Sequence, residues 1–288
     1  MEIELGISQT ALTAIGLLFG LLFGSFLNVV ILRLPVQLKG DWRRDSRDFL
    51  GLEPEPEPEQ PVTLAQPASR CPSCHEAIKP QHNIPLFSYL FLKGRCKSCA
   101  APISVQYPLV ELIAGLLAAY FIYQYGLSSQ SFYGLVFSYA LLVLTGIDLH
   151  EKLLPDQITL PLIWLGLFAN LNGNFVSLND AVIGAIAGYL SLWSVFWAFK
   201  LITGKEGMGY GDFKLLAALG AWMGWQMLPM IILLSTAAGA LVGIAGILLA
   251  GRDREMPIAF GPFLASAGWI AFVWGDAILS GYLRLFNF

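Results

Sequence analysis

The chain has 288 residues, of which 56% are hydrophobic and only 13% are charged. That charged share is about half of what a soluble domain carries, and the mean hydropathy is +0.64. This much apolar surface exceeds what a soluble core can bury, which predicts an all-α polytopic membrane protein in contact with a lipid bilayer. The net charge of −3 provides no basic field, so we expect no nucleic-acid partner.

The first apolar run predicts a transmembrane helix in residues 1–33. Its N-terminal end is acidic, whereas a signal peptide begins with basic residues, so we interpret the run as a retained helix. Gly16, Gly20, Gly24 and Asn28 recur every four residues and share one helix face. Small residues at this spacing favour close packing of a second helix, and an asparagine inside a span needs a polar partner.

Residues 34–106 are predicted to form a soluble cytoplasmic domain with an acidic, proline-alternating linker at residues 53–61. All four cysteines of the chain fall here, as two CxxC pairs about twenty residues apart, a spacing typical of a zinc ribbon. We expect a structural Zn²⁺, because four thiolates leave no open coordination position for catalysis. A redox dithiol pair is the alternative. The four predicted ligands are Cys71, Cys74, Cys96 and Cys99.

Residues 107–288 are predicted to form a transmembrane bundle, which with the first helix gives about eight spans. We expect these further helices over residues 107–125, 131–147, 158–171, 181–201, 213–227, 230–250 and 260–283. In this arrangement 16 of the 17 basic residues lie on the side of the cytoplasmic insertion, and Arg284 is the exception. Basic residues concentrate on the cytoplasmic side of membrane proteins, so we expect both termini to lie outside.

Two aspartates stand at helix ends on the predicted cytoplasmic side. Asp148 closes the third expected helix and Asp212 opens the sixth. If they meet, like-charge repulsion would make them share one proton, and such an acid–base pair can activate water and protonate a leaving amine. The alternative is that each aspartate only caps a helix. Asp156 is a third candidate that could cap the fourth helix, and the role of Glu111 is open.

Three glycines precede Asp212, at positions 207, 209 and 211. Such a backbone admits conformations that side chains block, so a peptide strand could approach closely. A phosphate-binding loop is the alternative, but the spacing is not that of a dinucleotide-binding motif.

Several motifs then follow one another in a distinctive order. They are GSFLNVVILRLP ending at Pro35, the two CxxC pairs, YPLVE ending at Glu111, Asp148 with Pro155 and Asp156, GYGD ending at Asp212, and PIAFGP ending at Pro262. This series resembles the type IV prepilin peptidases, also called prepilin leader peptidase/N-methyltransferases, over nearly the whole chain.

The resemblance implies a GxGD-type aspartic peptidase with Asp148 and Asp212 as the catalytic pair. It implies cleavage of type IV prepilins and pilin-like secretion subunits (pseudopilin precursors) after a glycine, followed by N-methylation of the new first residue from S-adenosylmethionine. Gly94 and Arg95 occupy the stretch that the family associates with methylation, although lysine is common at the second position. The implied location is the bacterial inner membrane, with the active site and the zinc domain facing the cytoplasm.

Three other interpretations compete with this one. A peptidase without methyltransferase activity would use the same aspartates. An ion-coupled transporter would place acids near the midplane and show an internal repeat, whereas these acids gather at one face. A membrane scaffold that docks partners through its zinc domain would have no use for the glycine–aspartate loop before Asp212.

Overall fold

The computed structural model describes residues 8–53, 62–79, 84–251 and 258–285. Most of the predicted linker at 53–61 and two of the basic residues counted above, Arg252 and Arg254, lie outside these ranges. The described residues form nine α-helices and two 3₁₀ helices and contain no β-strand, which confirms the all-α class. The chain divides into two compact units, residues 1–139 and 140–288, and the boundary falls inside helix α4 (Ser129–Glu151).

Helix α1 spans Gln9–Phe49 and is longer than predicted. The expected end at residue 33 is wrong, because the helix continues through Pro35 for a further four turns into the segment assigned to the soluble domain. The prediction equated loss of hydropathy with the end of the helix. However, lysine and arginine are good helix formers, and Asp41 pairs with Arg44 in this charged part.

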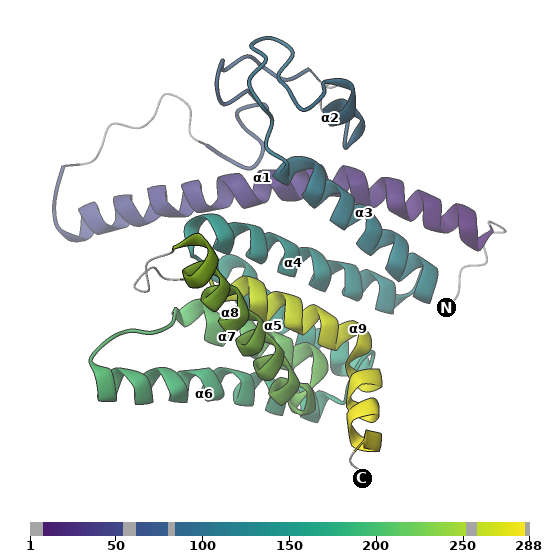
Figure 1. The fold of residues 1–288 in the computed structure, drawn as a ribbon, viewed down its shortest axis with the longest axis vertical. Helices are drawn as coiled ribbons and strands as arrows, with labels where there is room; N and C mark the ends of the chain where they lie inside the picture. Colours follow the sequence, from purple (N-terminus) through teal and green to yellow (C-terminus); the bar gives the residue numbers. More distant parts are fainter. Residues whose placement is uncertain (1–7, 54–61, 80–83, 252–257, 286–288) are drawn as a thin grey trace. The chain divides into compact units, whose positions relative to one another are not determined.

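The glycine face of α1 lies against α3 (Gln106–Tyr125) (Figure 1). A Cβ added at Gly20 would lie 2.5 Å from the Ala114 carbonyl oxygen, and one at Gly24 would lie 2.6 Å from the Glu111 Cα. The two backbones therefore touch, as the four-residue spacing predicts. The start of α4 joins this pair, since the Tyr139 hydroxyl donates to the Ala114 carbonyl at 3.1 Å.

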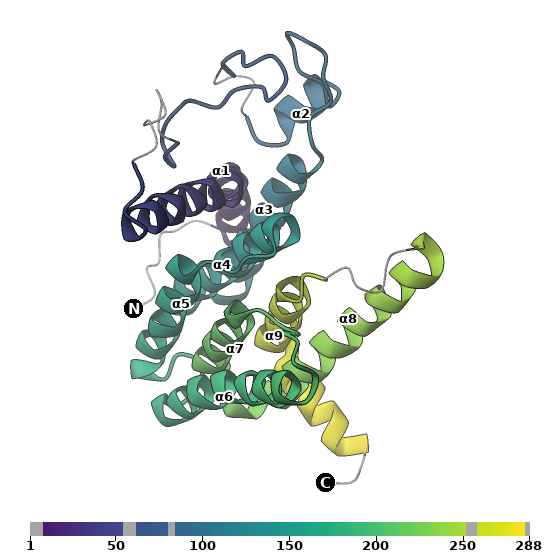
Figure 2. The same ribbon diagram turned by 90° about the vertical axis from the view of Figure 1, so that its left-hand side faces the viewer.

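The second unit holds the rest of α4 and five further α-helices (Figure 2). These are α5 (Asp156–Ala169), α6 (Leu178–Thr203), α7 (Tyr210–Met223), α8 (Leu228–Ala250) and α9 (Gly261–Leu285). The 3₁₀ helices η2 (Asn170–Asn172) and η3 (Trp225–Met227) follow α5 and α7, and η3 confirms the predicted break between the sixth and seventh helices. The short helix α2 (Phe87–Phe91) precedes α3 and was not predicted. From α3 to α9, the helix ends lie within four residues of the predicted ones.

Helix α7 is the core of the second unit. Every residue from Leu215 to Met223 is buried, and α5, α6 and α9 pack around it. Gly188 of α6 allows a close approach, because its Cβ would lie 2.5 Å from the Leu216 carbonyl oxygen. The Trp222 indole N–H donates to the Leu162 carbonyl of α5 at 2.8 Å. Asp212, in the first turn of α7, is thus fixed to a rigid element.

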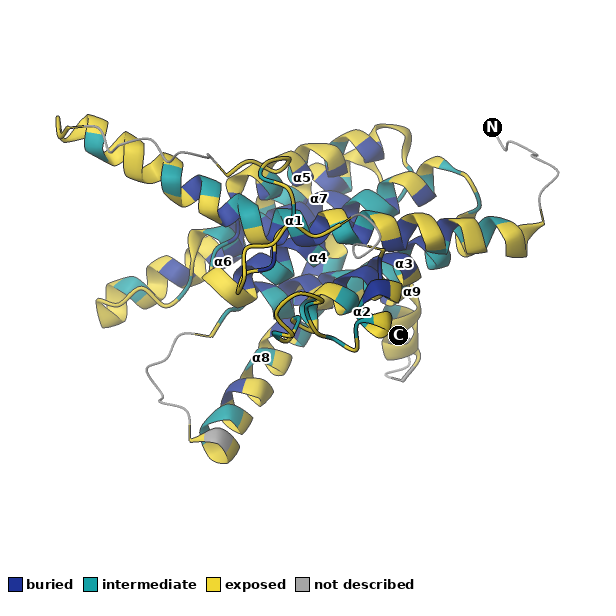
Figure 3. Cartoon of the chain, turned by 90° about the horizontal axis from the view of Figure 1, so that it is seen from above, coloured by how far each residue is buried: buried dark blue, intermediate teal, exposed yellow. Residues whose placement is uncertain are grey.

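Six of the described helices are long and apolar enough to cross a membrane, namely α1, α3, α4, α6, α8 and α9. The chain is therefore a multi-pass membrane protein. Helices α5 and α7 have 14 residues each, fewer than the ~20 that span a bilayer core. Only 17% of the apolar window of α8 is buried, and Figure 3 shows exposed residues along most of that helix. Lipid is the natural partner of such apolar surface.

Candidate aspartate site and metal centre

Asp148 lies near the C-terminal end of α4 with only 6% of its surface exposed. Its Oδ2 atom accepts a hydrogen bond of 3.0 Å from the backbone N–H of Gly261, the first residue of α9. A Cβ at position 261 would lie 2.7 Å from the same oxygen, so the approach requires glycine. The N-terminal end of a helix favours a carboxylate, and α9 thereby orients Asp148.

Asp212 lies in the first turn of α7 and is 7% exposed. Its carboxylate accepts a hydrogen bond from the backbone N–H of Gly209, the N-cap residue of the helix. A side chain at the third helical position that returns to the N-cap N–H is half of a capping box. The carboxyl group is therefore held by its own helix start, independently of the rest of the unit.

The structure brings the two aspartates together. Their carboxyl groups lie close enough to interact electrostatically. The buried side chain of Leu154 lines this region, since Cβ atoms at Gly211 and Gly261 would lie 2.7 and 3.0 Å from its atoms. Two largely buried carboxyl groups, each with one backbone donor, therefore lie within electrostatic range of each other.

Asp156 does not join this pair. It begins α5, and both of its carboxylate oxygens accept hydrogen bonds from the Lys214 ammonium group, at 2.6 and 2.7 Å. This ion pair connects α5 to α7. The structure thus gives Asp156 a role in packing two helices.

Packing explains two of the three glycines before Asp212. A Cβ at Gly207 would lie 2.9 Å from the Phe199 ring, and one at Gly211 would meet Leu154, as described above. Gly261 and Leu154 were given no role from the sequence. Gly261 stands in the PIAFGP motif, and that motif was the only available signal.

The four cysteines gather in two matching turns of the first unit. Each CxxC pair is followed by a residue with φ of +58°, His75 or Ala100. The N–H of that residue donates to the carbonyl of the first cysteine, Cys71 or Cys96, at 2.9 Å in both turns. Each turn is flanked by a single isolated β-bridge, so the described part forms two cysteine turns without the strands of a ribbon.

The cysteine sulfurs fit a tetrahedral metal ion. All four lie within 4.8 Å of one another, and the Sγ atoms of Cys71 and Cys99 are 3.8 Å apart. Zn–S bonds of about 2.3 Å at the tetrahedral angle place sulfurs about 3.8 Å apart. Hydrogen bonds from the backbone N–H groups of Cys74 and Ser73 lower the pKa of the Cys71 thiol to about 6, so at neutral pH this sulfur is the thiolate that metals bind.

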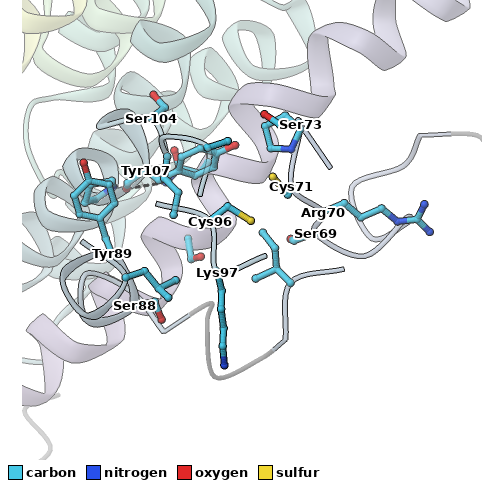
Figure 4. A pocket seen from close by; sticks show the side chains of 18 of the residues that line it. Ser69, Arg70, Cys71, Ser73, Ser88, Tyr89, Cys96, Lys97, Ser104 and Tyr107 are labelled. Atoms are coloured by element: carbon cyan, nitrogen blue, oxygen red, sulfur yellow. Dashed lines mark hydrogen bonds between the residues drawn. The ribbon is translucent and has the colours of Figure 1, made fainter. Parts of the chain in front are cut away.

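A cavity of about 460 Å³ lies in the first unit, between the two cysteine turns, α1 and α3 (Figure 4). Glu111 of α3 is among its lining residues and is 8% exposed. Gly94 and Arg95 are not among them. Gly94 has φ of +66° and donates to the Tyr89 carbonyl at 2.9 Å, while Arg95 forms the bridge to Pro102.

Comparisons with known proteins match nearly the whole chain. A family model described as the bacterial peptidase A24 N-terminal domain matches residues 18–125, and a model of the type IV leader peptidase family matches residues 135–244. An Aeromonas hydrophila protein named prepilin leader peptidase/N-methyltransferase is 55% identical over 269 residues, or 93% of each chain. The chain belongs to this family. Relatives with the same name are 54% identical in Pseudomonas aeruginosa, over 94% of this chain and 93% of the relative, and 50% identical in Xanthomonas campestris, over 92% of both. No solved structure matches.

The two ranges that the prepilin leader peptidase/N-methyltransferase family models match meet close to the boundary between the two units. The range matched by the N-terminal family model contains the four cysteines and the cavity, all of which belong to the first unit. The range matched by the type IV leader peptidase model contains both aspartates, which belong to the second.

Proposed function

We propose that this chain is a membrane-embedded aspartic endopeptidase that removes the leader of type IV prepilins and pilin-like secretion subunits, with Asp148 and Asp212 as the catalytic pair. The observation that supports it best is the meeting of these two buried carboxyl groups, one held by the Gly261 N–H and the other by the Gly209 N–H. The names and the similarity of the relatives support the substrate class.

The chemistry follows from the pairing of the two acids. Neighbouring carboxyl groups do not both ionise readily, so one keeps a proton while the other is charged. The ionised carboxylate takes a proton from a water molecule as it attacks the scissile carbonyl, and the protonated carboxyl donates to the leaving amine. This pair supplies both the acid and the base, and family resemblance implies cleavage after a glycine.

The position of the site suits such a substrate. A leader with basic residues stays in the cytoplasm and the following apolar helix lies in the bilayer, so the scissile bond is at the inner membrane surface. We place the aspartates and the cysteine turns on the cytoplasmic side of the bacterial inner membrane. The support is the charge distribution, with 16 of 17 basic residues on that side in the predicted topology.

We also propose that the same chain methylates the new N-terminal residue with S-adenosylmethionine as methyl donor. The name of the relatives supports this second activity. In this proposal Cys71, Cys74, Cys96 and Cys99 bind a structural Zn²⁺, since the sulfur spacing fits a tetrahedral ion. The metal would hold together a small domain that lacks strands of its own.

The decisive experiment incubates the purified protein in detergent with a prepilin and S-adenosylmethionine and follows the product by mass spectrometry. We expect Asp148→Asn and Asp212→Asn each to slow leader removal by about 10²- to 10⁴-fold, because each removes one side of the acid–base pair. Asp156→Asn is the matched control and should retain cleavage, since Asp156 pairs with Lys214. Wild-type cleavage rates in the first two variants would refute the proposal.

A further inference from the structure

The cavity in the first unit has the size of a small-molecule site. Its volume of about 460 Å³ lies within the range of roughly 300–1,000 Å³ that such sites occupy. Side chains from α1, α2, α3 and both cysteine turns line it, and Tyr89, Tyr107, Cys71 and Cys96 are among those seen in Figure 4. The aspartate chemistry makes no use of this cavity, because both aspartates belong to the other unit.

A buried carboxylate lines the cavity. Glu111 has an exposed fraction of 8%, and its Oε2 atom accepts a 2.9 Å hydrogen bond from the backbone N–H of Leu86. Ser25 of α1 forms a second hydrogen bond with the same carboxyl group. These two neutral donors hold the carboxylate in place and leave it capacity for further donors, since an ionised carboxylate has about four acceptor positions.

A buried acceptor without a partner lies beside it. Asn28 lines the same cavity and is 2% exposed. Its amide nitrogen donates to the carbonyls of Gly24 and Tyr107, at 3.4 and 3.1 Å. Two carbonyl neighbours require the NH₂ end there, which fixes the orientation of the amide. The Oδ1 atom has no hydrogen-bond partner, and buried acceptors rarely remain so without a ligand or water to satisfy them.

The helix contact described above places these two residues side by side. Gly24 of α1 touches the backbone of Glu111, and Asn28, one turn further along α1, bonds to Tyr107, one turn before Glu111 on α3. A carboxylate and a carbonyl oxygen therefore line one wall together. Arg33, Arg70 and Lys97 are also among the lining residues. Figure 4 shows the charged ends of Arg70 and Lys97 directed away from the cluster of labelled side chains, so their positive charges lie at the edge of the cavity.

We propose that Glu111 and Asn28 bind a primary ammonium group in this cavity and that the cavity is the N-methylation site, an inference that rests on the proposed methyltransferase activity. An ammonium group is the natural ligand because it offers three donors and a positive charge to acceptors alone. Both reactants carry one: the amino-acid end of S-adenosylmethionine and the N-terminus of the cleaved pilin. The pilin ammonium group must release a proton to solvent before its nitrogen takes the methyl group from the sulfonium, which leaves as S-adenosylhomocysteine.

The test compares Glu111→Gln with wild type and with Glu53→Gln, a matched change at an exposed residue of the same unit. Glutamine keeps one oxygen for the Leu86 N–H and nearly the same shape, but it replaces the other acceptor oxygen and the negative charge with an NH₂ donor. We expect methylation to slow about 10- to 100-fold, the value of a charge-assisted hydrogen bond, with unchanged leader cleavage. Methylation at the wild-type rate would overturn the proposal.

Binding measurements on the same variant separate the two sources of the ammonium group. A weaker affinity for radiolabelled S-adenosylmethionine in equilibrium dialysis would assign the site to the methyl donor. An unchanged affinity, with a raised KM for the cleaved pilin, would assign it to the peptide. Unchanged values of both would contradict the proposal.

Hydrogen exchange of the wild type covers the case in which Glu111→Gln also loses cleavage through misfolding. S-adenosylhomocysteine and a cleaved pilin are added separately, and at least one should protect residues 84–92 and 107–111. Absence of protection by either, in protein that methylates, would overturn this inference and leave the proposed function intact. A wild type that cleaves but methylates no prepilin would instead remove the methyltransferase activity itself.

Discussion

At the scale of single residues, the position of Asp148 depends on a glycine on another helix. The carboxylate accepts from the Gly261 N–H at 3.0 Å, and the space beside Gly261 is too small for a methyl group. Asp212 does not depend on another helix, because its carboxylate accepts a hydrogen bond from the backbone N–H of Gly209, at the start of its own helix. The two members of the pair should therefore respond differently to changes in α9.

We predict that Gly261→Ala slows leader cleavage about 10- to 100-fold while the protein remains folded. The added Cβ must displace the carboxylate, and shifts of about 1 Å in catalytic groups cost this much. Gly281→Ala in the same helix is the control, because nothing lies within 4 Å of its Cβ position. The test measures the steady-state rate of leader cleavage by both variants. Equal rates would show that the Gly261 contact is dispensable.

The sequence patterns predict the two aspartates better than they predict the residues that hold these side chains in position. Asp148 and Asp212 stand out because they are charged at the ends of apolar runs. The hydrogen bond from Gly261, the packing of Leu154 and the unsatisfied oxygen of Asn28 depend on contacts between distant segments. Periodicity along one segment contains no information about such contacts.

At the scale of elements, hydropathy located the helices of the bundle because burial in lipid and helix formation coincide there. It failed at the end of α1, where a charged helix continues outside the apolar run to Phe49. Hydropathy indicates whether a segment prefers lipid or water. It does not indicate where the backbone hydrogen bonds of a helix end.

The glycine face between α1 and α3 gives a prediction about stability. Gly20→Ala should lower the free energy of unfolding by about 1–3 kcal/mol, because the new methyl group overpacks a backbone contact. Gly40→Ala, on the same helix with nothing within 4 Å of its Cβ position, should raise it by about 0.5–1 kcal/mol through helix propensity.

Denaturant or thermal unfolding in detergent compares these two variants with wild type. If Gly20→Ala were as stable as Gly40→Ala, the close packing of α1 on α3 would not contribute to stability.

At the scale of the whole molecule, the cysteine cluster that we propose as a metal centre and the two aspartates belong to different compact units. The four cysteines lie between residues 71 and 99, and the aspartates lie in α4 and α7. A change at the metal centre should therefore act first on the chemistry of the first unit.

We predict that removal of zinc by a chelator, or Cys71→Ser, lowers methylation more than leader cleavage. Loss of the metal releases the two cysteine turns that line the cavity, while the aspartate pair keeps its own supports. Metal content, methylation and cleavage are measured on the same samples, and added Zn²⁺ should restore methylation after chelation. Equal loss of both activities would show that the cysteine domain also supports the peptidase.

The bond between Gly261 and Asp148 also bears on biosynthesis. The chain leaves the ribosome from its N-terminus, so α4 and α7 are made long before residue 261 of 288 appears. Until then Asp148 lacks the donor that orients it. If Asp148 acts as proposed, the site acquires its final geometry only after α9 is inserted beside α4, so cleavage would begin after that step.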